Sequence, residues 1–392
     1  MICEYRFRSA WSYSKETDCD RWESNMKRYA LFAATAMMVI LPLACRTTPP
    51  APEVQPEPAR FSDPDEIVEG DAFLVVADRR MFAAMAFLNA AGYDEEPEGF
   101  AMHPVRVKVR QAVKERLANE PRKLKTYEAY YREVIARRIP VFAYKDYVLS
   151  LSANYPFRPI QPADRLGYPY TAEPLRRLPE ILNEFWTLAN LEDLWKQVRT
   201  DYITEIHRYN VWKMKQQMAF LWEYLRLERQ DPFIIVHIPD LLSRHLGAMG
   251  AEYEPYFYCV DNPGANDGRL NMHEYLHTIV NPLVEAHYDE FEAKLNPYYS
   301  AVQRVPAVAA CGDPATFVYE CLVAALNRRI SIKFENDPTW TRRKEAQVAR
   351  DTKDGLILAQ PFYDGLAEYE RTTLSFDQFL PTLLAHLPEY RR

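Results

Sequence analysis

Residues 271–282 read Asn-Met-His-Glu-Tyr-Leu-His-Thr-Ile-Val-Asn-Pro, and this stretch decides both the expected fold and the expected chemistry. His273 and His277 are four residues apart, so on a helix they lie about 40° apart around the axis and one turn along it. Both imidazoles can therefore reach one ion. Zinc accepts neutral histidine nitrogens at about 2.0–2.1 Å, and a catalytic zinc site keeps one tetrahedral position open for water. Glu274 is placed to take a proton from that water and to deliver it to a leaving amine. The motif predicts a zinc ion and hydrolysis of an amide bond.

A third protein ligand is needed, and the residues after the motif narrow the choice. The metzincin pattern continues with x-x-Gly-x-x-His, but Val280 and Leu283 stand at those positions. The gluzincin alternative takes a glutamate from a later helix. Glu320 fits this role, because it is the one acidic residue in the otherwise apolar stretch 315–326. A carboxylate among apolar neighbours needs a partner, and a cation is one.

Two alternatives for the third ligand stay open. Glu320 can instead form a salt bridge with Arg328 or Arg329. Glu285 and His287 are then the rival zinc ligands, just past the proline at position 282.

Asn281-Pro282 is expected to end the helix that carries the motif, because the residue before a proline avoids the α region. A bond from Asn281 to a metal ligand is the alternative role for that side chain. Tyr319, beside Glu320, is a candidate donor to the oxyanion of the reaction, by the logic of preorganised donors.

The run His-Glu-x-x-His-x-x-Val-Asn-Pro at residues 273–282 resembles an uncharacterised bacterial family of zincin-like domains of unknown function, whose members often carry lipoprotein or secretory signals. Residues 76–93 are similar to the opening of that family, and the helix around Glu320 is similar to its later acid-bearing helix. The likeness spans residues 72–335. It implies a gluzincin-like peptidase fold, with ligand roles for His273, His277 and Glu320.

The N-terminal part contains a pattern typical of a secretory signal. Met26-Lys27-Arg28 precedes an apolar run over residues 29–44 and then Cys45. Residues 41–45, Leu-Pro-Leu-Ala-Cys, resemble a bacterial lipoprotein signal, in which the cysteine becomes the lipidated first residue. An ordinary cleaved signal or an uncleaved anchor is the alternative. Residues 1–25 are interpreted as preceding the true translation start.

Five prolines between residues 46 and 61 favour extended polyproline II, so residues 46–70 are interpreted as a stiff tether. Arg46, rather than Asp, follows Cys45, which favours the outer membrane over retention at the inner membrane. We therefore expect a domain over residues 71–392 that is held in the cell envelope by a lipid on Cys45.

Composition limits the class of the domain. The 392 residues are 48% hydrophobic and 13% aromatic, which is enough for a sizeable core. The net charge is −7 and no block of Lys and Arg stands out, so nucleic acid is not an expected partner. No Cys-x-x-Cys pair occurs, which argues against a zinc site built on cysteines. A disulfide between Cys311 and Cys321 is left open.

The pattern predicts a mostly helical α+β domain of the zincin-like type with a small sheet. Strands are expected at residues 73–77, 233–237 and 256–260, and a loop at residues 154–173. Helices are expected at residues 79–91, 105–118, 123–138, 174–200 and 202–229, and again from residue 269, with breaks at Pro282, Pro297, Pro306, Pro314 and Pro338.

The function expected from these residues is that of a membrane-tethered zinc metallopeptidase acting on peptides or proteins, with Glu274 as the general base. Two alternatives remain. One is a binding or scaffold lipoprotein with a zincin fold but no turnover, which Glu274 argues against, because a binding site needs no general base. The other is a zinc hydrolase of cell-wall amide bonds, whose chemistry is the same.

Overall fold

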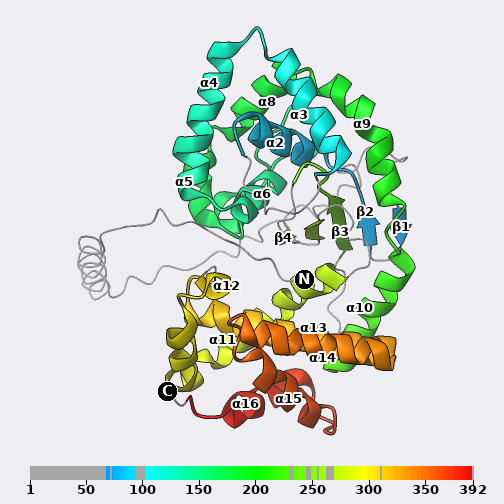
Figure 1. The fold of residues 1–392 in the computed structure, drawn as a ribbon, viewed down its shortest axis with the longest axis vertical. Coiled ribbons are helices and arrows are strands. Elements are labelled where there is room, and N and C mark those ends of the chain that lie inside the picture. Colours follow the sequence, from blue (N-terminus) through cyan, green and yellow to red (C-terminus); the bar gives the residue numbers. More distant parts are fainter. Residues whose placement is uncertain are drawn as a thin grey trace, which may run out of the picture. The chain divides into compact units, whose positions relative to one another are not determined.

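The computed structural model describes residues 68–70, 73–93, 102–228, 234–243, 249–253, 256–261, 269–309 and 311–390. The expected start segment, the signal peptide, the lipidation site at Cys45 and the tether up to residue 67 lie outside the described residues. The described part is a mostly helical α+β fold with one small mixed sheet, as the sequence predicts (Figure 1).

The strand order of the sheet is β1-β2-β3-β5-β4. The strands are β1 (Val68–Gly70), β2 (Phe73–Val75), β3 (Ile234–Pro239), β4 (Met249–Tyr253) and β5 (Tyr256–Asp261). The three strands expected from the sequence are confirmed as the parallel centre, β2-β3-β5. The antiparallel edges β1 and β4 were not predicted, because neither has the run of branched apolar residues that marks a strand. The sheet thus begins at Val68, within the last three residues of the expected tether.

The helices before β3 are α2 (Arg79–Ala90), α3 (Pro104–Arg116), α4 (Pro121–Tyr130), α5 (Ala136–Arg138), α6 (Val141–Leu149), α7 (Ala172–Leu175), α8 (Leu178–Leu188), α9 (Leu191–Ile206) and α10 (Val211–Leu225). Of these, α2 is buried along nearly its whole length and packs against α3, α4, α6 and α8, whereas α10 packs against the later helix α13 (Pro314–Glu335). The helix expected over residues 174–200 is interrupted, because Asn190 adopts a left-handed conformation with φ 44° between α8 and α9. Asn210 then caps α10 by accepting a hydrogen bond from the Lys213 backbone N–H.

The helices after the sheet include α11 (Arg269–Val302), which carries the His-Glu motif. They continue with α12 (Pro306–Ala309), α13 (Pro314–Glu335), α14 (Pro338–Lys353), α15 (Ala359–Tyr369) and α16 (Phe376–His386). The breaks predicted at Pro306, Pro314 and Pro338 are confirmed, since each proline stands at the start of a helix, where its missing N–H costs nothing.

The breaks predicted at Pro282 and Pro297 are wrong, because α11 runs through both prolines. A proline inside a helix removes one backbone hydrogen bond, which packing against neighbours can outweigh. Here α11 packs along α13 and also contacts β4, β5 and α16. The motif therefore lies near the start of one helix of 34 residues, rather than on a short helix that ends at Asn281.

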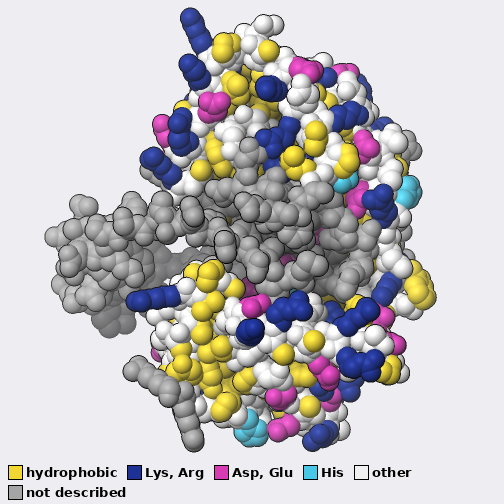
Figure 2. All heavy atoms as spheres, in the orientation of Figure 1, with side chains coloured by type: hydrophobic (Ala, Val, Ile, Leu, Met, Phe, Trp, Pro, Cys, Tyr) yellow, Lys and Arg dark blue, Asp and Glu magenta, His cyan; other side chains and the backbone are white. Residues whose placement is uncertain are grey.

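None of the described helices combines the length and the apolar composition needed to cross a membrane. On the face drawn in Figure 2, Lys and Arg side chains are scattered among acidic and apolar ones. The cysteines Cys259, Cys311 and Cys321 form no disulfide with one another.

The edge strand β4 approaches α11 at Gly250. A Cβ atom at this position would lie 2.9 Å from Cζ of Phe257 and 3.3 Å from Cβ of Glu274. Phe257 is itself buried and packs edge-on against Tyr275 of α11. Gly250 therefore permits the close contact between the sheet edge and the turn of α11 that carries the motif.

We expect Gly250→Ala to lower the free energy of unfolding by about 1–3 kcal/mol, because an added methyl group overfills a packed contact. The measurement is denaturant unfolding. In a Phe257→Leu background the same substitution should cost less, since the shorter side chain vacates part of the space. Equal costs in the two backgrounds would show that the Phe257 ring does not limit the contact.

Candidate metal centre

The packing of α13 on α11 brings Glu320 to the two motif histidines. Nε2 of His273 lies 3.3 Å from Nε2 of His277. The Glu320 carboxylate spans both, with Oε2 3.5 Å from Nε2 of His273 and Oε1 3.5 Å from Nε2 of His277. Ligand atoms around a tetrahedral zinc ion are about 3.3 Å apart when each bond is about 2.0 Å. The spacing of these three side chains therefore fits one zinc ion.

The protonation states of His277 and Glu320 also suit metal binding, which needs neutral imidazole and ionised carboxylate. Burial favours the neutral form of His277 and lowers its pKa. Burial works to raise the pKa of Glu320, but the hydrogen bond to His273 and the charges of the two imidazoles outweigh it and lower this pKa to about 2. Glu320 is thus an anion whose partners are the histidines.

His273 is held differently from His277. Burial disfavours its charged form, but the hydrogen bond and the negative charge of Glu320 prevail and raise the pKa of this imidazole. The imidazole of His273 and the carboxylate of Glu320 thus stabilise one another's charged forms. A metal ion at this centre would compete with a proton for the imidazole.

Asn281 fixes the orientation of His277. Its Oδ1 atom lies 3.1 Å from Nδ1 of His277, and a carbonyl oxygen can only accept, so Nδ1 carries the proton. The lone pair is then on Nε2, which faces His273 and Glu320. An acceptor that binds the second ring nitrogen of a metal-binding histidine sets the tautomer and the orientation of the ring. The interpretation of Asn281 as a helix terminator is therefore wrong, and its alternative role is the one the structure supports.

Glu274 follows His273 on α11. Gly250 of the edge strand β4 lies against its side chain. Burial raises the pKa of the Glu274 carboxyl to about 7. The charge of His273 and a backbone hydrogen bond from Gly250 work in the opposite direction, while Glu320 and Asp261 add to the rise. Glu274 is thus held by the sheet edge and is separate from the three converging side chains.

The rival ligands lie elsewhere. Because α11 continues past Pro282, Glu285 and His287 are about 12 and 15 Å further along the helix than His277. Glu285 accepts a hydrogen bond from the Tyr319 hydroxyl at 3.1 Å. The Tyr319 hydroxyl is therefore directed to Glu285, and its suggested role as an oxyanion donor stays a prediction. The alternative salt bridge of Glu320 is not formed either, since Arg328 pairs with Asp351 and Arg329 with Glu370.

Tyr168, on the segment expected to be a loop, is a residue that sequence reasoning did not single out. Burial, together with the charge of Asp146 and the neighbouring Tyr170, raises its pKa to about 12, and the charges of Glu274 and Glu320 add to this rise. Tyr168 thus lies within electrostatic reach of the candidate centre. No short motif marks it, because Tyr168 comes near Glu274 and Glu320 only in the folded chain.

Comparison with models of known protein families, with curated proteins and with solved structures finds no match to this chain. The resemblance to a zincin-like family stays a prediction.

We expect His273→Ala, His277→Ala and Glu320→Ala each to lower the zinc content of the purified chain by one ion. Each substitution removes one of three ligands that the packing of α11 and α13 brings together. Glu285→Ala and His287→Ala are the matched controls on the same helix and should leave the content unchanged. The measurement is elemental analysis after dialysis. Loss of zinc in a control variant, or full retention in Glu320→Ala, would contradict the assignment.

We expect Asn281→Ala to weaken zinc binding at this centre about 10- to 100-fold, because His277 loses the acceptor that fixes its tautomer. Asn281→Asp keeps an acceptor at the same place and should bind zinc at least as tightly as the original chain. Competition with a chromophoric chelator measures both. An unchanged affinity in Asn281→Ala would assign this side chain a purely structural role.

Proposed function

We propose that this chain is a zinc-dependent hydrolase of peptide bonds, with His273, His277 and Glu320 as ligands and Glu274 as the general base. The observation that supports this most is the convergence of two imidazole nitrogens and one carboxylate within hydrogen-bonding range of one another, next to a glutamate on the same turn of helix. Zinc bound there would supply a Lewis acid that polarises the scissile carbonyl and lowers the pKa of water.

The protein's own part of the reaction rests on Glu274. A general base has to lie within reach of the attacking water and has to return the proton to the departing nitrogen. The charges of His273 and Glu320 act on the Glu274 carboxyl, which therefore lies within electrostatic reach of the centre without being one of the three converging groups. The contact with Gly250 fixes the side chain from the sheet side.

The position of β4 supports a peptide as the substrate. This strand is the last in the order of the described sheet, and its Gly250 lies against Glu274. An extended peptide can pair with an edge strand through main-chain hydrogen bonds. A chain bound along β4 would therefore pass the general base in an extended form.

Hydrolysis of cell-wall amides is the second candidate, because the same groups act on any amide. A lipid on Cys45 would hold either enzyme at a membrane of the cell envelope, and that anchor stays a prediction. A binding protein without turnover is the third, and the placement of Glu274 beside the centre speaks against it.

We expect Glu274→Gln to lower the rate of peptide hydrolysis about 10²- to 10⁴-fold, the usual contribution of a general base. Zinc content should not change, because Glu274 is not a ligand. Glu285→Gln is the matched control on α11 and should keep full activity. The measurement is turnover of a peptide library and, in parallel, of peptidoglycan fragments, by mass spectrometry.

The substrate assay separates the three candidates. Cleavage of fragments alone identifies a cell-wall hydrolase. A wild-type chain that binds zinc at the His-His-Glu centre and cleaves neither substrate favours the binding protein. Activity that survives in Glu274→Gln would contradict the role given to this residue.

A further inference from the structure

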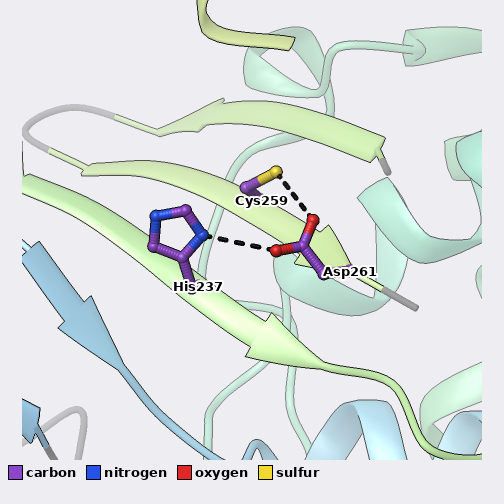
Figure 3. Close-up of side chains that lie close together, drawn as sticks. All are labelled: His237, Cys259 and Asp261. Carbon is purple, nitrogen blue, oxygen red and sulfur yellow. Dashed lines mark hydrogen bonds and ion pairs between the residues drawn. The ribbon is translucent and has the colours of Figure 1, made fainter. Parts of the chain in front are cut away.

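A second group of metal-binding side chains lies inside the sheet. His237 is on β3, and Cys259 and Asp261 are on the neighbouring strand β5. The register places His237 opposite Cys259, and Asp261 follows two residues later on the same face of β5. Figure 3 shows the three side chains close together, His237 on β3 and the other two on β5. All three are fully buried.

The contact between His237 and Asp261 is longer than a good hydrogen bond between charged groups, because Nδ1 of His237 lies 3.5 Å from Oδ2 of Asp261. The Cys259 thiol lies 3.4 Å from Oδ1 of Asp261, an ordinary distance for a thiol that donates to an oxygen. An imidazolium–carboxylate pair closes to about 2.7–2.9 Å. Within the described part of the chain, both ring nitrogens of His237 have no hydrogen-bond partner. The three ligand atoms lie within 4.8 Å of one another, which leaves His237 room to share a further partner with Cys259 and Asp261.

The charge of Asp261 calls for such a partner. Among the described residues, its other side-chain contacts are with the Cys259 thiol and with the Tyr209 hydroxyl, the latter at 3.3 Å, and both are neutral donors. The nearby buried ammonium of Lys145 pairs with Asp240 at 3.0 Å. A fully buried carboxylate without a cation is costly.

The distances match those around zinc. With a zinc–nitrogen or zinc–oxygen bond of about 2.0 Å and a zinc–sulfur bond of about 2.3 Å, tetrahedral ligand atoms are about 3.3–3.5 Å apart. The donor types fit as well, since imidazole, thiolate and carboxylate are all zinc ligands. We propose that His237, Cys259 and Asp261 bind a second zinc ion, which ties β3 to β5.

The charges of this site balance. A thiolate and a carboxylate together offset the two positive charges of zinc, so the sheet would hold a neutral centre. A bound cation is what makes a thiolate stable in buried surroundings. The Tyr209 hydroxyl lies beside the cluster and its ring contacts that of His237. Because no ligand is shared with the His-His-Glu centre, the two sites can be tested separately.

Cobalt substitution tests this site in the wild-type full chain. Cobalt bound to a thiolate has an intense charge-transfer absorption in the near ultraviolet, and the His-His-Glu centre offers only nitrogen and oxygen. We expect two cobalt or zinc ions per chain and a thiolate band. X-ray absorption at the zinc edge should show a sulfur neighbour at about 2.3 Å.

Variants assign the band to its residue. Cys259→Ser should abolish it and lower the metal content by one ion, whereas Cys321→Ser, at another fully buried cysteine of the described chain, should change neither. His273→Ala should remove the other ion and keep the band. A wild-type chain without a thiolate band and without a sulfur neighbour would overturn the proposal, even if Cys259→Ser does not fold. A band that survives in Cys259→Ser would overturn it as well.

Discussion

Glu320 meets both imidazoles because α13 packs along α11, and the candidate centre depends on this one helix–helix contact. The spacing of His273 and His277 aligns two donors on one helix, but two donors do not hold an ion in place. The third has to come from a helix that is fixed on its other sides. Helix α13 meets this condition, since it also packs against α10, α14 and α15. The apolar neighbours of Glu320 on this helix are buried, which fixes the face of α13 that turns toward α11.

The sheet contributes to the same region from the other side. Gly250 of the edge strand lies against Glu274, and Asp261 of β5 contributes to the raised pKa of that glutamate. The buried His237–Cys259–Asp261 cluster and the His-His-Glu centre are therefore neighbours in electrostatic terms. A neutral centre within the sheet would remove the influence of one buried anion on the general base. The sheet thus acts on Glu274 in two ways, through the packing of Gly250 and through the charge of Asp261.

The features that could be predicted from the sequence are those that depend on residues close together in the chain. The pair His273–His277 depends only on helical spacing, and Glu320 stands out as an acid in an apolar run. The strands β2, β3 and β5 are marked by branched apolar residues. Local patterns did not indicate β4, because its sequence Met-Gly-Ala-Glu-Tyr owes its place to Gly250 and to pairing with β5.

The wrong predictions share a cause. Pro282 was expected to end α11 on local grounds, yet tertiary packing carries the helix through it. Asn281 then remains in register with His277, four residues before it, and this spacing could have indicated its role. The buried cluster could not be found from cysteine spacing, because its ligands are joined by strand register and not by sequence distance. The absence of a Cys-x-x-Cys pair therefore argues only against a zinc site built on several cysteines, and not against a mixed site with one cysteine.

Helix α11 is also attached at its far end. The Lys294 ammonium donates to the backbone oxygen of Ala385, and the Tyr298 hydroxyl donates to that of Pro388. The last described residues of the chain are therefore fastened to the helix that bears both histidines. The segment around Ala385 and Pro388 therefore braces, from the far side, the helix whose first turns carry the candidate metal centre.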